Sequence, residues 1–255
     1  LYGKDRMHSE RGMPNVMNYE SILQTIPEEH LWPHNDMWGL HDFCLEGAQG
    51  AASFLEIVEK AFGPAENAEQ FSQYAQWINY DGYRGIFEGR SEFRRGMLLW
   101  MSHPAWPSMV WQTYDYFFDP TAAYFGCKKA SEPLHIQWNP VFHDIEVVNL
   151  HAGSCEGLRA HAQIINTDGS VQWEKDTLVN SNEDSTIKCF RLEFPGTLSD
   201  VYFIKLTLSQ NDRILSENFY WRGLEEGNLQ ALKNLPKVSL STKTKSQKEG
   251  DQWKL

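Results

Sequence analysis

The sequence predicts a chain of two structural classes, an α/β part over residues 1–132 and an antiparallel β-sandwich over residues 133–240. In the first part apolar residues recur at helical spacing in several segments, and one continuous apolar run follows them. In the second part apolar residues alternate with polar residues. The period changes near Ser131 to Pro133. Residues 241–255 are polar and lysine-rich, and we expect a linker or the opening strand of a further β-domain that is cut off.

The first part contains three predicted helices and one predicted strand. Residues 17–26 form a short helix that ends at Pro27, because proline does not continue a helix. A second helix places one apolar stripe on a single face: Phe54, Ile57, Val58, Ala61 and Phe62. A longer helix begins at Phe71 and continues towards Phe87. The apolar run 96–101, "GMLLWM", predicts a strand buried on both faces, as in a parallel sheet.

The second part shows the period of two that is typical of strands with one buried face. Three segments alternate in this way: 158–165, 189–194 and 204–208. Turn-forming pairs stand near or between them: Asp168-Gly169, Pro195-Gly196 and Asn211-Asp212. Short strands separated by such turns predict an antiparallel sandwich, whose core we expect Trp138, Trp173 and Trp221 to fill.

Composition excludes several classes of protein. The net charge is −11 and no basic stripe precedes the lysine-rich end, so nucleic acid is not expected as a partner. No run approaches the roughly 18 apolar residues of a membrane span, and residues 1–10 contain no apolar signal core. The four cysteines contain no Cys-x-x-Cys pair, so we interpret Cys44, Cys127, Cys155 and Cys189 as small buried apolar groups rather than disulfide partners or metal ligands.

Aromatic residues make up 13% of the chain, and three tryptophans, Trp100, Trp106 and Trp111, fall within twelve residues. Aromatic rings stack on the apolar faces of sugars, and they also fill protein cores. Composition alone does not separate these two uses.

The segment from Leu98 to Trp138, "LLWMSHPAWPSMVWQTYDYFFDPTAAYFGCKKASEPLHIQW", resembles glycoside hydrolase family 2, in particular its exo-β-D-glucosaminidase and β-mannosidase-like branch. The resemblance also covers "SERGMPNVMNYES" (9–21) and "ENFYWRG…LKNLP" (217–236), so it follows nearly the whole chain in order. It implies that residues 1–132 are the end of a (β/α)8 TIM barrel, with its seventh and eighth strands, and that the sandwich is immunoglobulin-like.

The family's nucleophile, carried onto this sequence, is Glu10, at the C-terminal end of a barrel strand where catalytic residues of such barrels lie. Retaining glycosidases use two carboxyl groups about 5 to 5.5 Å apart, one as nucleophile and one as acid/base. Arg11 and Ser9 are adjacent groups that could favour the anion. The alternative is that Glu10 is a solvated turn residue.

The resemblance places the acid/base upstream of Leu1, and the available carboxylates do not occupy its position: Asp36, Asp42, Glu46 and Asp115. We therefore expect the C-terminal portion of a larger retaining exo-β-glycosidase, packed against the upstream domains of the same protein. A terminal β-linked glucosaminide or mannoside is the favoured substrate. The alternative is a non-catalytic carbohydrate-binding or structural module. Relatives of this kind favour a periplasmic or secreted location.

Further residues are candidates for sugar contact. Trp100 is expected as the floor of the sugar site, with Trp106 and Trp111 following in the loop, and core packing is the alternative for each. Relatives can carry asparagines where "WMSHPAW" has Ser102 and His103, which alters the expected sugar contacts.

The segment 28–43 belongs to the long connection after the first strand, and Asp36, Trp38 and His41 are its candidates for substrate contact, against the alternative of a packed loop. His30, His34 and His41 suggest a metal, but Pro33 interrupts the helix that paired ligands would need. No metal and no cofactor are expected.

Overall fold

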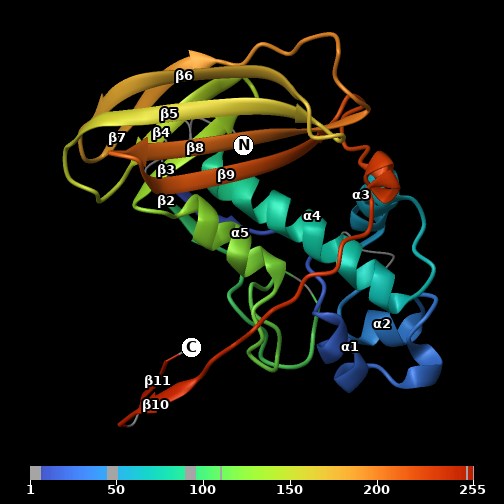
Figure 1. Ribbon diagram of the computed structural model, residues 1–255. Helices are drawn as coiled ribbons and strands as arrows, with labels where there is room; N and C mark the ends of the chain where they lie inside the picture. Colours follow the sequence, from blue (N-terminus) through green and yellow to red (C-terminus); the bar gives the residue numbers. More distant parts are fainter. Residues whose placement is uncertain (1–6, 45–50, 90–95, 110, 251, 255) are drawn as a thin grey trace.

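The computed structural model describes residues 7–44, 51–89, 96–109, 111–250 and 252–254. Figure 1 shows a β-sandwich lying over two helices, α4 and α5, with the shorter helices gathered towards the far end of α4. The helices are α1 (Tyr19–Thr25), α2 (Asp36–Leu40), α3 (Ala51–Phe62), α4 (Ala68–Glu88) and α5 (Ala122–Ala130), with 3-10 turns η1 (Glu28–His30) and η2 (Gln230–Asn234). The described helices include none with the length and hydropathy of a membrane span.

Two short strands, β1 (Met7–Arg11) and β2 (Gly96–Leu99), form a parallel pair in which His8 lies opposite Met97. The predicted strand at 96–101 is therefore confirmed in a shorter form. The expectation that it is buried on both faces is wrong, because Leu98 is 55% exposed. Among the described residues β2 pairs with β1 alone, so one of its sides has no neighbouring strand. A complete barrel around this pair stays a prediction.

The helical spacing in the sequence is confirmed by α1, α3 and α4, which share one buried apolar cluster. Of the predicted stripe on α3, Ala61 and Phe62 belong to a second cluster and Ile57 is 49% exposed. α4 begins where Asn67 Oδ1 accepts a hydrogen bond from Gln70 N at 2.9 Å, which satisfies one of the free N–H groups at a helix start. α5 packs closely on α4. A Cβ at Gly126 would lie 2.4 Å from Tyr80 O, so this close packing requires glycine.

The sandwich consists of two antiparallel sheets with strand orders β3-β4-β7 and β6-β5-β8-β9. The strands are β3 (Leu134–Asn139), β4 (Asp144–Asn149), β5 (Cys155–Asn166), β6 (Val171–Ser181), β7 (Ser185–Arg191), β8 (Val201–Gln210) and β9 (Arg213–Gly223). Their inward side chains form one core, including the predicted Ile204, Leu206 and Leu208, each 0% exposed. The turn between β8 and β9 needs positive φ at Asn211 and Asp212, as their residue types predict.

The three sandwich tryptophans have different surroundings. Trp138 is buried in the core and Trp173 packs against its edge, as expected. Trp221 does not enter this core. Its side chain points out of β9 and meets Trp77 of α4, with ring centroids 4.4 Å apart, so it belongs to the contact between sandwich and helices. The four cysteines are free thiols and half-buried.

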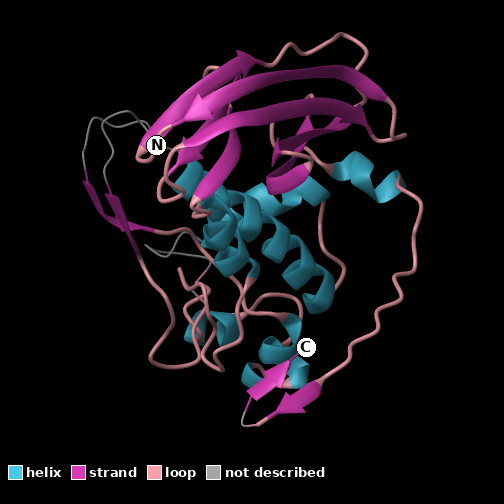
Figure 2. Cartoon of the chain, turned by 60° about the vertical axis from the view of Figure 1, so that its left-hand side comes forward, coloured by secondary structure: helices cyan, strands magenta, loops and turns pink. Residues whose placement is uncertain are grey.

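The C-terminal residues leave the folded body. Residues 236–246 form no helix or strand, and they lead to a hairpin of β10 (Gln247–Glu249) and β11 (Gln252–Lys254), as Figure 2 shows. The predicted final strand is present. It pairs antiparallel with β10, and whether it opens a further β-domain stays a prediction.

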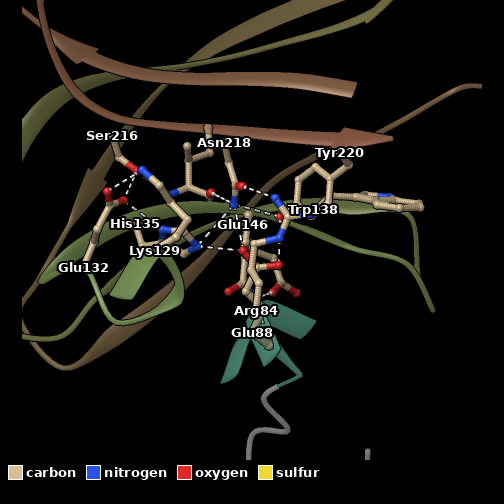
Figure 3. A network of polar contacts seen from close by, with 12 residues as sticks. Arg84, Glu88, Lys129, Glu132, His135, Trp138, Glu146, Ser216, Asn218 and Tyr220 are labelled. Carbon is tan, nitrogen blue, oxygen red and sulfur yellow. Dashed lines mark hydrogen bonds and ion pairs between the residues drawn. The ribbon is translucent and has the colours of Figure 1, made fainter. Parts of the chain in front are cut away.

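A buried polar network joins α4 to the sandwich at the side where the edge strands β3 and β9 lie (Figure 3). Its centre is Glu88, which is 7% exposed. Glu88 Oε1 contacts His135 Nε2 at 2.9 Å and accepts from Asn218 Nδ2 at 2.7 Å, while Oε2 accepts from Tyr220 OH at 3.0 Å. The other ring nitrogen of His135 contacts Glu132 Oε2 at 3.0 Å. Because each nitrogen faces a carboxylate, the doubly protonated imidazolium is the form that donates to both.

Arg84 is the second charge of this network and is 1% exposed. One terminal nitrogen donates to Asn218 Oδ1 at 2.8 Å and to Phe219 O at 2.6 Å, and the other pairs with Asp81. The Tyr220 ring lies under its guanidinium, 4.1 Å from the ring centroid. Ions removed from water are stable only when they are paired and hydrogen-bonded. The network pairs these charges with groups from α4, β3, β9 and the residue Glu132 before β3, and among the donors of Arg84 its Nε has no hydrogen-bond partner within the described chain.

We predict that Glu88→Ala lowers the free energy of unfolding by about 3–5 kcal/mol, because it removes one of the two carboxylates that face the buried His135 and deprives Asn218 and Tyr220 of this acceptor. Urea denaturation followed by tryptophan fluorescence measures the loss. Glu217→Ala is the matched control, since Glu217 is exposed on β9, and it should change the value by less than about 0.5 kcal/mol. Equal effects of the two substitutions would contradict the role of Glu88.

The network also predicts a pH dependence. Burial alone would lower the pKa of His135, but its hydrogen bonds to Glu132 and Glu88 outweigh burial and raise that pKa. A raised folded pKa gives stability that is complete below the unfolded value, about 6.5, and is lost as the pH rises through the folded value. The free energy of unfolding should therefore fall more steeply above about pH 6.5 in the wild type than in His135→Gln.

The measurement is a series of urea denaturations across this pH range. His161→Gln is the control, because His161 pairs with Glu174 at the exposed face of β5 and β6 and should leave the steep dependence intact. Parallel pH curves for the wild type and His135→Gln would show that His135 gives no such stability.

Candidate active site

Glu10 is the next-to-last residue of β1, and its side chain is exposed. It lines a small open pocket of about 140 Å³ together with Arg11, Gly12, Trp100 and Trp111. Three residues predicted for sugar binding or catalysis, Glu10, Trp100 and Trp111, are therefore brought to one place. Their assembly follows from the parallel pairing, since the C-terminal ends of β1 and β2 meet at the same edge.

The pocket is closed on one side by a close backbone contact between the two strand ends. Trp100 N donates to Arg11 O at 2.8 Å, and a Cβ at Gly12 would lie 2.0 Å from Trp100 O. Only glycine fits this approach. The Trp100–Met101 peptide is cis. Met101 N donates to Trp111 O at 2.7 Å, and this hydrogen bond holds Trp111 beside the pocket.

The loop after β2 is held by further hydrogen bonds. Ser102 O accepts from Thr113 N at 2.9 Å and from Tyr114 N at 2.8 Å. Asn15 Nδ2 donates to Gln112 O and, at 3.0 Å, to Thr121 Oγ1. The loop is thereby fixed to the chain segment that follows β1.

Asp115 has a structural role in this loop. It is 2% exposed, and its Oδ2 accepts from Ser21 Oγ of α1 at 2.5 Å. Its Oδ1 accepts from the backbone N–H groups of Phe117 and Asp119. Asp115 thus anchors a turn of this loop against α1.

The sequence predicts that none of the four available carboxylates occupies the acid/base position. None of the three that the structure describes, Asp36, Asp42 and Asp115, lines the Glu10 pocket. Glu46 lies outside the described residues. Within the described part of the chain, the pocket therefore contains one carboxylate.

His103 and Trp106 are exposed in the loop but do not line this pocket. The His103 ring lies 5.5 Å from that of Phe118, and Ser102 Oγ lies 3.2 Å from its Nδ1. Trp106 is 46% exposed and stacks on His41, whose Nδ1 contacts Pro107 O at 2.6 Å.

The segment 28–43 separates into exposed and core residues. Asp36 is exposed in the first turn of α2. Trp38 is 0% exposed, and its Nε1 donates to Leu31 O at 3.2 Å and His30 O at 3.3 Å. The expectation that Trp38 contacts substrate does not fit this position, because an amphipathic helix turns its indole into the core.

The histidines of this segment are not gathered as ligands. His34 packs among aromatic rings, including Trp38 at 4.4 Å and Phe71 at 4.3 Å, and burial lowers its pKa to about 4. In the part of the chain that the structure describes, no group of three His, Cys, Asp or Glu side chains is placed to hold a metal ion.

Arg11 was named from the sequence only as a neighbour of Glu10, and its observed contact is different. Its Nε donates to Nδ1 of His8, which is 7% exposed, at 2.9 Å. No motif in the sequence points to His8, because a lone histidine in a short strand has no characteristic spacing. The need for Gly12 could be suspected from the Arg-Gly-Met-Pro turn, but its contact lies 88 residues away, at Trp100.

No protein-family model matches the chain. It is similar to the exo-β-D-glucosaminidase of Amycolatopsis orientalis, with 30% identity over 219 residues that cover 82% of this chain and 21% of that protein. It is also similar to the mannosylglycoprotein endo-β-mannosidase of Lilium longiflorum, with 29% identity over 196 residues that cover 73% of this chain and 20% of the other. The chain belongs to glycoside hydrolase family 2.

The family assignment agrees with the fold. The crystal structure of the Amycolatopsis orientalis exo-chitosanase CsxA superimposes with a TM-score of 0.83 and 22% identity, covering 95% of this chain and 32% of that one. This chain spans about a fifth of the length of the two curated relatives from Amycolatopsis orientalis and Lilium longiflorum.

We predict that Gly12→Ala lowers the free energy of unfolding by about 1–3 kcal/mol, because the new methyl group must displace the Trp100 carbonyl. The tryptophan emission maximum should shift at the same time, since Trp100 and Trp111 flank the contact. Gly39→Ala is the control, because a Cβ at Gly39 of α2 meets no atom within 4 Å. Urea denaturation of both variants makes the comparison. A Gly12→Ala protein as stable as Gly39→Ala would contradict the contact.

Proposed function

We propose that the full-length protein is a retaining exo-β-glycosidase in which Glu10 is the nucleophile. The observation that carries this proposal is the position of Glu10, at the C-terminal end of a parallel strand and in a pocket with Trp100 and Trp111, in a family 2 chain. The proposal includes a (β/α)8 barrel that β1 and β2 help to form, and an immunoglobulin-like class for the sandwich.

In the proposed reaction the Glu10 carboxylate attacks the anomeric carbon, and the glycosidic bond to the leaving oxygen breaks. A carboxylic acid from another part of the protein protonates that oxygen. The same group then takes a proton from water, which attacks the glycosyl-enzyme ester and releases Glu10. An exposed, rigid strand end suits the nucleophile, because the attacking oxygen must be held close to the anomeric carbon.

The aromatic residues around Glu10 support sugar binding. Trp100 is 43% exposed beside Glu10, so its ring can stack on the apolar face of a sugar, and Trp111 lines the same pocket. Trp106, His103 and Asp36 are exposed but lie outside the pocket, and we propose that they contact the part of the substrate beyond the sugar at Glu10.

The relatives guide the choice of substrate. One is named an exo-β-D-glucosaminidase and another an endo-β-mannosidase, so we propose a β-linked glucosaminide or mannoside, and we propose cleavage at the terminal sugar as in the name of the first. The segment is proposed to pack against upstream domains of its own protein, which supply the acid/base. The same family resemblance supports a periplasmic or secreted location.

The test is hydrolysis of p-nitrophenyl β-glycosides (glucosaminide, mannoside, galactoside and glucuronide) by the full-length protein. Glu10→Gln should lower kcat by about 1000-fold or more, because the amide cannot form the glycosyl ester. Glu20→Gln, at an exposed position in the first turn of α1, should leave kcat unchanged.

A second readout identifies the role of Glu10. In Glu10→Ala, added azide should form a glycosyl azide of inverted anomeric configuration, because a small anion then replaces the missing nucleophile. Full activity of Glu10→Gln would refute the proposal. An inactive wild type that still binds sugar would favour a non-catalytic carbohydrate-binding module.

A further inference from the structure

Arg11 is the second charged residue of the Glu10 pocket and its one cation among the lining residues. Its side chain is exposed, but it is not free to rotate, because Nε donates to His8 Nδ1 at 2.9 Å. His8 is itself held in β1, where it pairs with Met97 of β2 and is 7% exposed. The strand therefore carries a buried imidazole that fixes the direction of an exposed guanidinium.

The hydrogen bond to His8 uses one of the five N–H donors of Arg11. Among the described residues, the guanidinium forms no other hydrogen bond and no ion pair, not even with the adjacent Glu10. Four donors and a permanent positive charge are thus available to whatever occupies the pocket. A guanidinium that is already oriented loses less entropy when it binds a ligand oxygen.

These contacts decide which sugars suit the pocket. A hydroxyl or a carboxylate of the sugar accepts hydrogen bonds from a guanidinium, whereas an ammonium group offers no lone pair and carries the same charge. Glu10 alone would attract a cationic sugar, but Arg11 offsets that attraction. In the part of the pocket that the described residues form, the two charges together give no net preference for a cation.

We propose that Arg11, oriented by His8, is a specificity-determining residue that favours an uncharged or anionic sugar over one that carries a protonated amine. This inference rests on the proposed function of the Glu10 pocket. Of the two sugars favoured above, it selects the mannoside over the glucosaminide.

The experiment compares two inhibitors that differ at one substituent. D-glucose and D-glucosamine are tested as competitive inhibitors of the full-length protein, with whichever p-nitrophenyl glycoside it hydrolyses fastest, at about pH 6, where the amine is protonated. The measured quantity is the ratio of the inhibition constant of glucosamine to that of glucose. The variants are Arg11→Gln, Arg11→Lys and Arg11→Glu.

Arg11→Gln should lower this ratio about 3- to 10-fold, the size expected for one unit charge acting over several ångströms in a partly solvated site. Arg11→Glu should lower it further, and Arg11→Lys, which keeps the charge, should lower it less than twofold. Lys60→Glu is the matched control. It changes the net charge as Arg11→Glu does, but on α3, on the opposite side of Figure 1 from β2, so the ratio should not move.

An unchanged ratio in both Arg11→Gln and Arg11→Glu would overturn the inference, and so would an equal change in Lys60→Glu, which would indicate a long-range effect of net charge. These results leave the proposed function standing if Glu10→Gln is inactive. If Glu10→Gln retains full activity, the proposed function fails and the specificity inference fails with it.

Discussion

The carboxylate of Glu88 is the contact on which the arrangement of this chain depends. It lies at the end of α4 and accepts hydrogen bonds from Asn218 and Tyr220 while facing His135, so it ties the helix to β9 and β3 together. Both are edge strands, and an uncovered strand edge invites wrong pairing. The buried charged groups of the network cover the edges of β3 and β9. They also set the angle of α4 to the sandwich, because few positions of the helix allow all of these hydrogen bonds at once.

The position of α4 in turn fixes the segment that follows Glu10. Asn79 Nδ2 of α4 donates to Pro14 O at 2.6 Å, and Tyr83 OH donates to Met13 O at 3.0 Å. The backbone after β1 is therefore held by the same helix that ends at Glu88. The sandwich is thus connected to the backbone beside the pocket through one helix, α4.

Much of this fold could be predicted from the sequence, and the failures have physical causes. Helices such as α3 and α4 carry a regular apolar stripe, and turns such as Asn211-Asp212 contain residues that tolerate positive φ, so both kinds of element are visible locally. β3, "LHIQWN", alternates just as clearly, yet its polar residues are buried against Glu88 and Glu146 and do not face water. A pattern alone cannot say what covers the polar face.

The same limit applies to the site. The family resemblance brings Glu10, Trp100 and Trp111 to attention, and the strand pairing places them around one pocket. Trp38 was misplaced because an indole in a polar segment looks the same whether it faces solvent or the core. The contact of Arg11 with His8 depends on side-chain direction within an irregular strand, where the register shifts between these residues, and no spacing rule gives that direction.

The attachment of the loop after β2 has a consequence for how molecules enter and leave. Many enzymes close over a bound substrate with a loop that swings on hinges, and its opening then limits turnover. Here the loop is joined to β1 through the hydrogen bond from Trp100 N to Arg11 O. The backbone at Gly12 packs directly against the Trp100 carbonyl, so no space is left between the two strand ends. The first residue of the loop is thus tied to the end of β1, and its later part is tied to Asn15 after β1 through Gln112. On this side of the proposed sugar site, we therefore expect a mouth that stays open, with ligand exchange set by diffusion and by contacts with the ligand and not by loop opening.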